Sequence, residues 1–104
     1  MTNDLPRILD PVLLRALAEP TRLELVGLLI ARGGSANVGT LAEAVAVDTS
    51  VVSRHLAELA RAGVLARERR GRERWYTLEL DTLIAHFAEI TRQLQAVRDG
   101  LPCC

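Results

Sequence analysis

The stretch VDTSVVSRHLAELARAGVL, residues 47–65, decides the fold that this chain can adopt. Asp48 or Thr49 can cap the start of a helix here, and a glycine near the end of the stretch can stop it. Apolar residues recur at spacings of four, three and four, which predicts a stripe that faces the core: Val52, Leu56, Leu59 and Gly63. The stretch is therefore interpreted as an amphipathic helix packed on a small core.

The opposite face of this helix is polar and basic. It is predicted to turn outward and consists of Thr49, Ser50, Ser53, Arg54, Ala57 and Arg61. Small hydrogen-bonding side chains at its N-terminal end can approach base edges closely, as the N-terminal ends of recognition helices do. We therefore expect this helix to lie in the major groove of DNA. His55, beside the outward face, is expected to pack on the DNA side or to contact a phosphate.

The residues just before this stretch predict the first helix of a helix-turn-helix. Thr40 can cap a helix over residues 40–45, and Glu43 stands at the capping-box position. The inward-facing residues of this helix are predicted to be Leu41, Ala44 and Val45. Ala46 and Val47 would form the tight turn between the two helices.

Two further helices are predicted upstream. Asp10 and Pro11 begin a short helix that Pro20 ends, and its apolar positions are Val12, Leu13, Ala16 and Leu17. The second helix starts at the same proline, stops at a glycine pair and should be largely buried. Its apolar positions at helical spacing are Leu23, Val26, Gly27 and Ile30, broadened by Leu25, Leu28 and Leu29. Residues 35–39 are expected to form a linker or a short extended segment.

A β-hairpin with an arginine-rich tip is predicted after the recognition helix. Residues 64–70 and 74–78 would be its strands, with Gly71 in the connection. A hairpin in this place is a wing, whose arginines contact phosphates or the minor groove and so position the protein. The candidates are Arg69, Arg70, Arg72 and Arg74. Residues 54–74 hold seven Arg and three Glu, a net of +4 in a chain whose net charge is zero.

The last helix is predicted from about Asp81 to Asp99. Its apolar residues are spaced by four and three alternately and form a seam: Leu83, Phe87, Ile90, Leu94, Val97 and Leu101. A seam at the end of so small a domain favours burial against a second copy, so a homodimer is expected. His86, next to the seam, is expected to be partly buried and hydrogen-bonded.

The 104 residues are expected to form one domain. We divide the chain into a flexible N-terminal arm (1–9), a DNA-binding and dimerisation domain (10–99) and a C-terminal thiol tail (100–104). No apolar run reaches the roughly 18 residues that a membrane helix needs, and no secretory signal is visible. A cytoplasmic protein without a membrane partner is expected. An enzyme is not, because the sequence shows no nucleophile–base pair, phosphate-cradling loop or cluster of carboxylates.

Three segments together resemble the ArsR/SmtB family of winged-helix repressors. They are LAEPTRLELVGLL (17–29), TSVVSRHLAELARAGVL (49–65) and RRGRERWYTL (69–78). The resemblance covers roughly residues 10–98. It implies a winged helix-turn-helix, mainly α with a small β-hairpin, that dimerises through its terminal helices. Such proteins bind palindromic operator DNA and leave it when a metal, metalloid or other inducer binds.

The usual inducer sites of the family are missing from this sequence. Where many members carry a Cys-x-Cys signature, the chain reads Asn37-Val38-Gly39. The positions of the acidic and histidine ligands in the last helix hold Leu80, Thr82, Gln93 and Ala96. What remains is Cys103-Cys104, which resembles the C-terminal cysteine pairs of some arsenical-responsive members.

The chemistry of this cysteine pair favours a soft ligand. Adjacent Cα atoms lie ~3.8 Å apart, below the usual ~4.4 Å of a disulfide, so free thiols are expected in a reducing cytoplasm. Thiolates select thiophilic ions. Two of them suit methylarsenite, whereas arsenite would need a third from the other subunit or an outside thiol. No cofactor is required on this interpretation, and Cys103 and Cys104 are predicted to bind a trivalent arsenical or another thiophilic metal or metalloid as inducer.

Two alternatives stay open at this point. The same thiols could sense oxidants or reactive sulfur in a protein that still represses from DNA. Alternatively, the winged helix could serve only protein contacts, and salt-dependent binding to duplex DNA would then be missing.

Overall fold

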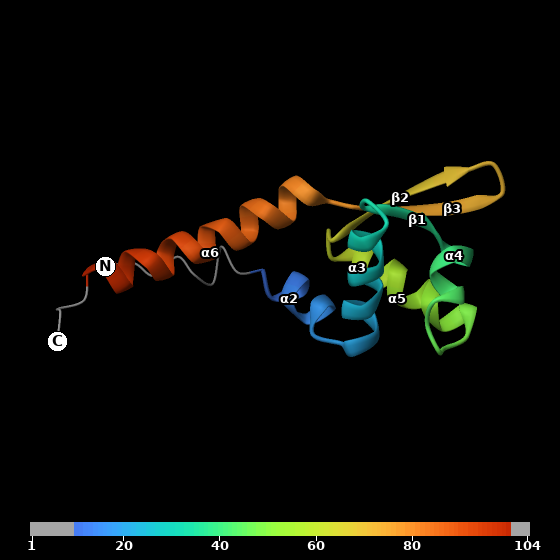
Figure 1. Ribbon diagram of the computed structural model, residues 1–104, viewed down its shortest axis with the longest axis horizontal. Helices are drawn as coiled ribbons and strands as arrows, with labels where there is room; N and C mark the ends of the chain where they lie inside the picture. Colours follow the sequence, from blue (N-terminus) through green and yellow to red (C-terminus); the bar gives the residue numbers. More distant parts are fainter. Residues whose placement is uncertain (1–9, 101–104) are drawn as a thin grey trace.

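The computed structural model describes residues 10–100 (Figure 1). Its elements in chain order are α2 (Pro11–Leu17), α3 (Pro20–Ala31), β1 (Ser35–Asn37), α4 (Val38–Glu43), α5 (Thr49–Arg61), β2 (Leu65–Arg70), β3 (Glu73–Leu78) and α6 (Leu80–Gly100). The predicted mainly helical winged helix-turn-helix is confirmed. The predicted arm (1–9) and most of the predicted tail, with Leu101, Cys103 and Cys104, lie outside the described residues.

The ends of the first two helices are fixed by side-chain caps. Asp10 Oδ1 accepts a hydrogen bond from the backbone N–H of Val12 at 3.0 Å, and Pro11 occupies the first helical position. Glu19 Oε2 accepts from the N–H of Arg22 at 2.8 Å and caps α3 in the same way. These contacts satisfy N–H groups that have no partner within a helix. The predicted break between the helices at Pro20 is confirmed.

The face of α3 that packs on the core differs from the predicted one. Leu25 and Leu29 are fully buried, whereas Leu23 is 52% exposed and Ile30 is 65% exposed. The predicted buried stripe through Leu23 and Ile30 is therefore wrong. The physical reason is that α3 is apolar on most of its circumference, so residue spacing cannot decide which stripe meets the other helices.

Helix α4 begins two residues earlier than predicted. Its N-cap is Asn37, whose Oδ1 accepts a hydrogen bond from the N–H of Thr40 at 2.7 Å, so the predicted cap by Thr40 is wrong. Both residue types cap well, and the end of β1 at Asn37 decides between them. Leu41 is buried as predicted, but Ala44 comes after the last helical residue and is exposed.

Helix α5 carries the centre of the core. Val52, Leu56 and Leu59 are fully buried, as predicted. Gly63 is exposed and has a φ of 83°, so its predicted place in the core is wrong, and Ala62 is buried instead. A left-handed residue just after a helix ends it, and glycine adopts that conformation without strain. The N-cap is Asp48, without a side-chain capping bond.

The sheet has three antiparallel strands in the order β1-β3-β2. Residues 35–37 therefore form an extra strand on β3, which the sequence left as a linker or an extended segment. Leu65 pairs with Leu78, and the register runs out to the turn at Gly71, which has a φ of 63°. The inner end of the hairpin packs on the core through three buried side chains, Leu65, Tyr76 and Leu78.

Helix α6 projects away from the other elements (Figure 1), in a molecule 57 Å long and 24 by 22 Å across. None of its residues is buried. The apolar side chains of the predicted seam differ in exposure within the single chain. Leu83 and Ile90 are half-buried, while the exposed apolar side chains are Leu80, Ile84, Phe87, Leu94 and Val97. No helix within residues 10–100 is long and apolar enough to cross a membrane.

His86 is half-buried and packs edge-on against Phe87, with ring centroids 5.3 Å apart. Its Nε2 atom is buried and has no hydrogen-bond partner among residues 10–100. The predicted partial burial is confirmed, but the predicted hydrogen bond is not found at this nitrogen.

Candidate nucleic-acid interface

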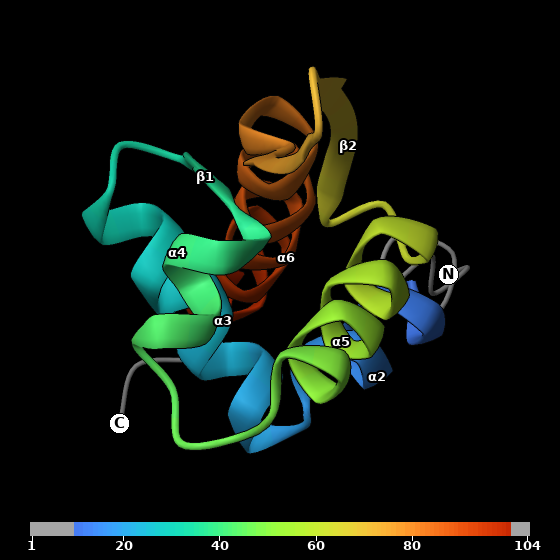
Figure 2. The same cartoon turned by 90° about the vertical axis from the view of Figure 1, so that its right-hand side faces the viewer.

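The candidate interface lies at the end of the molecule opposite α6. Figure 2 looks onto this end, where α4, α5 and the hairpin face the viewer and α6 runs away behind them. Ser50, Arg54 and Arg61 of α5 are exposed on the side away from its buried stripe. Thr49 is exposed as well, and Ser53 is half-buried beside it. The predicted outward face of the recognition helix is therefore confirmed as accessible.

A hollow of about 400 Å³ joins α5 to the wing and to the start of α4. Thr49 and Ser53 line it from α5, and Arg72, Glu73 and Arg74 line it from the hairpin. The fold thus brings the small polar side chains of the helix next to two of the four predicted wing arginines. Hydrogen-bonding groups and guanidinium groups around one concave surface suit the base edges and phosphates of DNA.

Asn37 links the wing to the start of α4, two of the segments that line this hollow. Its Nδ2 donates a hydrogen bond to Glu73 Oε2 at 2.8 Å, while its Oδ1 caps α4. Asn37 also stands opposite Trp75 in the register of β1 and β3. One side chain therefore fixes the angle between the wing and the first helix of the helix-turn-helix. Nothing in the local sequence indicates this role, because Glu73 follows 36 residues later.

The register of the hairpin sorts its arginines between two faces. Residues directly opposite each other lie on one face, and successive residues alternate. Arg67 stands opposite Tyr76, and Arg69 stands opposite Arg74. These three arginines therefore lie on the same face of the hairpin as Tyr76, whose side chain is buried in the core. Together they line a second concave surface, of about 350 Å³. Arg67 was not among the predicted phosphate contacts, since its face is known only from the register.

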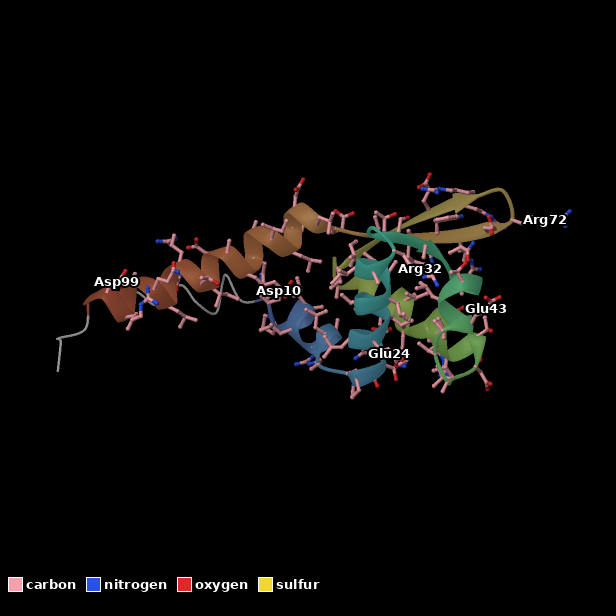
Figure 3. All side chains as sticks on the ribbon, viewed as in Figure 1. Asp10, Glu24, Arg32, Glu43, Arg72 and Asp99 are labelled. Carbon is pink, nitrogen blue, oxygen red and sulfur yellow. The ribbon has the colours of Figure 1, made fainter. Side chains whose placement is uncertain are left out.

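Arg70 lies on the other face of the hairpin. Its guanidinium carbon is 4.3 Å from the centroid of the Trp75 ring, and its Nη2 is 3.2 Å from Glu68 Oε2. A cation over an aromatic face is attracted by the ring quadrupole. Arg70, predicted as a phosphate contact, is thus engaged in contacts within the wing. Arg72 is at the tip of the hairpin (Figure 3), where it lines the hollow between the wing and α5.

His55 lies on the flank of α5 that faces α3. Its side chain is 20% exposed, and its Nδ1 is 3.3 Å from Arg22 Nη1 and 3.8 Å from Glu19 Oε2. Sequence spacing found no carboxylate near this histidine, because Glu19 is brought there only by the packing of α3 on α5. The backbone N–H of Arg22, which bonds the Glu19 carboxylate, is the largest cause that lowers its pKa below 4.5. The N–H of Thr21 and the charges of His55 and Arg22 add to this, against a desolvation that raises the pKa.

The predicted inducer ligands fall outside the part of the chain that the structure describes. Within residues 10–100, no group of three or more His, Cys, Asp and Glu side chains is arranged to hold a metal ion. The two cysteines of the chain are Cys103 and Cys104, which lie beyond the described residues.

Comparisons with known proteins agree with this geometry. Residues 17–68 match the model of a helix-turn-helix domain family. The arsenic resistance transcriptional regulator ArsR1 of Pseudomonas putida KT2440 is 40% identical over 68 residues, which is 65% of this chain and 52% of that protein. The chain therefore spans about half the length of this curated relative.

Two solved structures extend the similarity over nearly the whole chain. A possible transcriptional regulator for arsenical resistance is 31% identical, with a TM-score of 0.66 over 88% of this chain and 97% of that one. An ArsR family transcriptional regulator is 28% identical, with a TM-score of 0.75 over 93% of this chain and 96% of that one. The chain belongs to the ArsR/SmtB family of winged helix-turn-helix transcriptional regulators.

Proposed function

We propose that this regulator is a dimeric repressor that binds operator DNA through α5 and the wing and leaves it when a thiophilic metalloid binds Cys103 and Cys104. The observation that carries the DNA-binding part is the hollow that places Thr49 and Ser53 next to Arg72 and Arg74. Polar side chains that can read bases and cations that can hold phosphates share one surface there.

Within this surface the roles divide by position. Ser50, Ser53 and Arg54 are accessible on α5 and would read base edges or nearby phosphates in the major groove. Arg69 and Arg74 on the inner face of the hairpin would hold the backbone, with Arg72 at the tip. Arg70 would act indirectly, by stiffening the wing through Trp75.

The exposed apolar side chains of α6 support the proposal of a dimer. Ile84 is 64%, Leu94 61% and Val97 62% exposed, on a helix with no buried residue in the single chain. A helix of 21 residues is about 31 Å long and offers a long apolar surface. Contiguous exposed apolar surface on a small protein marks an interaction site. A second copy of the same helix is the partner proposed here, because a symmetric dimer would place two recognition helices on a palindromic operator.

The proposed inducer rests on the relatives and on the cysteines. One relative carries arsenic resistance in its name, and one solved structure is ascribed to arsenical resistance. Cys103 and Cys104 are the only cysteines of this sequence, and they stand three and four residues after the end of α6. Two neighbouring thiolates suit methylarsenite, which is thiophilic, and arsenite would need a third thiolate from the other subunit or an outside thiol.

Few residues separate α6 from the candidate DNA-binding surface of the protein. Only Glu79 separates β3 from α6, and its N–H donates to the carbonyl of Val64 at 3.0 Å, just after α5. A change in how two α6 helices pack would therefore turn the wing and the recognition helix together. The inducer must bind the free form more tightly than the DNA-bound form, because otherwise it shifts no population.

The DNA-binding part is tested with duplexes selected by the purified protein from a random-sequence library. Enrichment of a palindromic sequence, bound with an affinity that falls steeply with salt, is the expected result. Ser53→Ala should relax the preference at particular base pairs, whereas Arg74→Gln should weaken binding to all sequences alike. A protein that binds no duplex at low salt contradicts the proposal and favours a module for protein contacts.

The inducer is tested by titrating the protein–DNA complex with methylarsenite and arsenite in a mobility-shift assay. Release is expected for the wild type and not for Cys103→Ser/Cys104→Ser. Equal release of the double variant would rule out sensing through these thiols. Hydrogen peroxide and polysulfide are titrated in parallel. Release by either of them, without a response to arsenicals, would favour a redox or sulfur sensor.

A further inference from the structure

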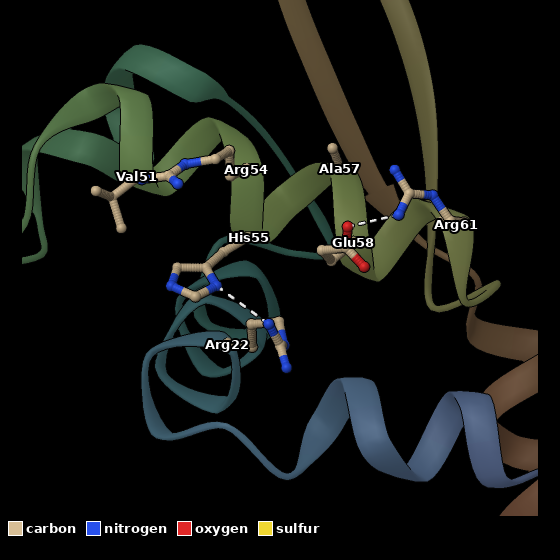
Figure 4. A pocket seen from close by; sticks show the side chains of 7 residues that line it. All are labelled: Arg22, Val51, Arg54, His55, Ala57, Glu58 and Arg61. Atoms are coloured by element: carbon tan, nitrogen blue, oxygen red, sulfur yellow. Dashed lines mark hydrogen bonds and ion pairs between the residues drawn. The ribbon is translucent and has the colours of Figure 1, made fainter.

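A third hollow, of about 380 Å³, lies on the flank of α5 away from the wing (Figure 4). Val51, Arg54, His55, Glu58 and Arg61 line it from α5, and Arg22 lines it from the first turn of α3. An α-helix with its side chains is about 10–12 Å wide, and the major groove of DNA is about 12 Å wide. A recognition helix therefore fills the groove, and each of its flanks meets a phosphate backbone. The wing can contact the phosphate backbone on only one of these flanks.

Arg22 is held rigidly at the floor of this hollow. Its Nε donates to the carbonyl of Ala16 at 2.6 Å, and its Nη2 lies 3.5 Å from the carbonyl of Arg15. The remaining nitrogen, Nη1, is 3.3 Å from His55 Nδ1 (Figure 4). The carbonyls at the end of α2 thus fix a guanidinium group that points one donor at the histidine.

This contact decides which ring nitrogen of His55 carries the proton. A guanidinium group has donors and no acceptor, so Nδ1 must accept the hydrogen bond with its lone pair. The neutral ring then carries its proton on Nε2, on the far side of the ring from Arg22. His55 thereby becomes a donor whose direction is set by Arg22.

The charged side chains that the structure describes around the hollow differ in whether they are paired. Arg61 Nη1 is 2.6 Å from Glu58 Oε1, so the C-terminal end of the hollow is nearly neutral. Glu19 Oε2 is 3.8 Å from His55 Nδ1, the ring nitrogen that faces Arg22. Arg54 makes no ion pair with any residue from 10 to 100 and lines the same hollow as His55. A cation beside an oriented N–H donor suits one phosphate group.

We propose that this hollow binds one phosphate of the DNA backbone at the edge of the major groove opposite the wing. Arg54 supplies the charge, the Nε2–H of His55 donates the directed hydrogen bond, and Arg22 is the positioning residue that keeps Nδ1 as an acceptor. The recognition helix is then clamped on both flanks. This inference rests on the proposed DNA-binding function and adds a second backbone contact to it.

Two substitutions of His55 separate a phosphate donor from a structural histidine. In His55→Asn the amide oxygen can still accept from Arg22, but nothing replaces the outward N–H. In His55→Gln the longer amide can place an N–H near the former Nε2, but the acceptor for Arg22 is lost. The probe is the duplex that the wild type selects from a random library. We expect His55→Asn to weaken its binding about tenfold and His55→Gln to stay within about threefold of the wild type.

The salt dependence of the same binding distinguishes the two donors. His55→Asn should leave the slope of log K against log salt unchanged, because a neutral donor displaces no counterion. Arg54→Gln should reduce the slope by about 0.9 for each chain bound. Thermal unfolding of each variant confirms that the fold is retained. A purely structural histidine predicts the reverse order, in which His55→Gln loses stability and binding while His55→Asn keeps both, and that order would overturn the inference.

Nitrogen NMR of the His55 ring in the wild-type protein tests the positioning step without any substitution. At pH 7.5 we expect a protonated Nε2 and an unprotonated Nδ1 in the free protein, and a shifted Nε2 signal when the duplex is added. A proton on Nδ1, or an Nε2 signal that DNA leaves in place, would contradict the inference while leaving the proposed function intact. A wild-type protein that binds no duplex would instead remove the proposed function itself.

Discussion

Asn37 and Glu73 are joined by a hydrogen bond of 2.8 Å between Nδ2 and Oε2, which ties the first helix of the helix-turn-helix to the wing. The other end of the same amide caps α4 through the N–H of Thr40. Both halves of the candidate DNA surface therefore depend on the orientation of a single side chain.

Substitutions of Asn37 should separate these two functions. Asn37→Ala loses the cap and should lower the free energy of unfolding by about 1 kcal/mol, measured by urea denaturation. Asn37→Asp keeps a capping oxygen but sets a carboxylate against Glu73. It should leave stability within about 0.5 kcal/mol of the wild type and still weaken duplex binding, because the wing is no longer held. Equal binding by Asn37→Asp and the wild type would show that this tie does not matter for DNA.

The wing arginines should differ according to their face of the hairpin. Arg69→Gln and Arg74→Gln each remove a cation from the inner face and should lower the salt slope of duplex binding by about 0.9 per chain. Arg70→Gln is the matched control on the outer face and should leave the slope unchanged. It should instead alter the fluorescence of Trp75, the only tryptophan, by removing the guanidinium from its ring. A drop in slope for Arg70→Gln as large as for Arg74→Gln would refute this division.

The exposed face of α6 should control the oligomeric state. Leu94→Glu puts a charge on a side chain that is 61% exposed in the single chain, so it should cost the monomer little. Buried against a second α6, the same charge would be unpaired, and sedimentation should show dissociation at concentrations where the wild type is a dimer. Gln95→Glu, on an exposed polar position of the same helix, is the control and should remain dimeric. Unaltered sedimentation of Leu94→Glu would place any dimer contact elsewhere.

The lowered pKa of Glu19 predicts that the free energy of unfolding depends on pH in the acid range. Because the N–H of Arg22 holds the pKa of this carboxyl below its usual 4.5, ionised Glu19 stabilises the fold above pH 4.5. That stabilisation is lost as the pH falls through the lowered pKa of the folded state. Urea denaturation between pH 3 and 6 should show Glu19→Gln less stable than the wild type above pH 4.5, with the difference disappearing at the acid end. Glu24→Gln, exposed on the same helix, should not show this pattern.

The elements of the fold follow largely from local sequence. The stripe Val52, Leu56 and Leu59 predicts α5, and Pro20 predicts the break between α2 and α3. The wing follows from its strand-forming residues and from Gly71. These signals act within a few residues of chain, so spacing and turn chemistry are enough to identify them.

Only part of the candidate site could be predicted from the local sequence. The sequence indicated the outward residues of α5 and four wing arginines, but it could not choose among these arginines or show that Arg67 lies on the same face as Arg69 and Arg74. It also placed the cap of α4 at Thr40 and the buried stripe of α3 through Leu23. In each case several residues of similar chemistry could take the predicted role. Which of them does so depends on contacts with segments that are distant in the sequence.

What the sequence alone determined is which segments become helix or strand, and that a basic helix and hairpin lie together in the middle of the chain. What only the tertiary structure decided is the set of pairs that link distant segments. The register of β2 and β3 places Arg70 on the same face as Trp75, which its guanidinium contacts, and leaves Arg69 and Arg74 on the other face. The packing of α3 on α5 brings Arg22 to His55 across 33 residues. Local propensity acts over a few residues of chain, whereas these contacts depend on how whole elements pack, and packing is settled only when the core closes.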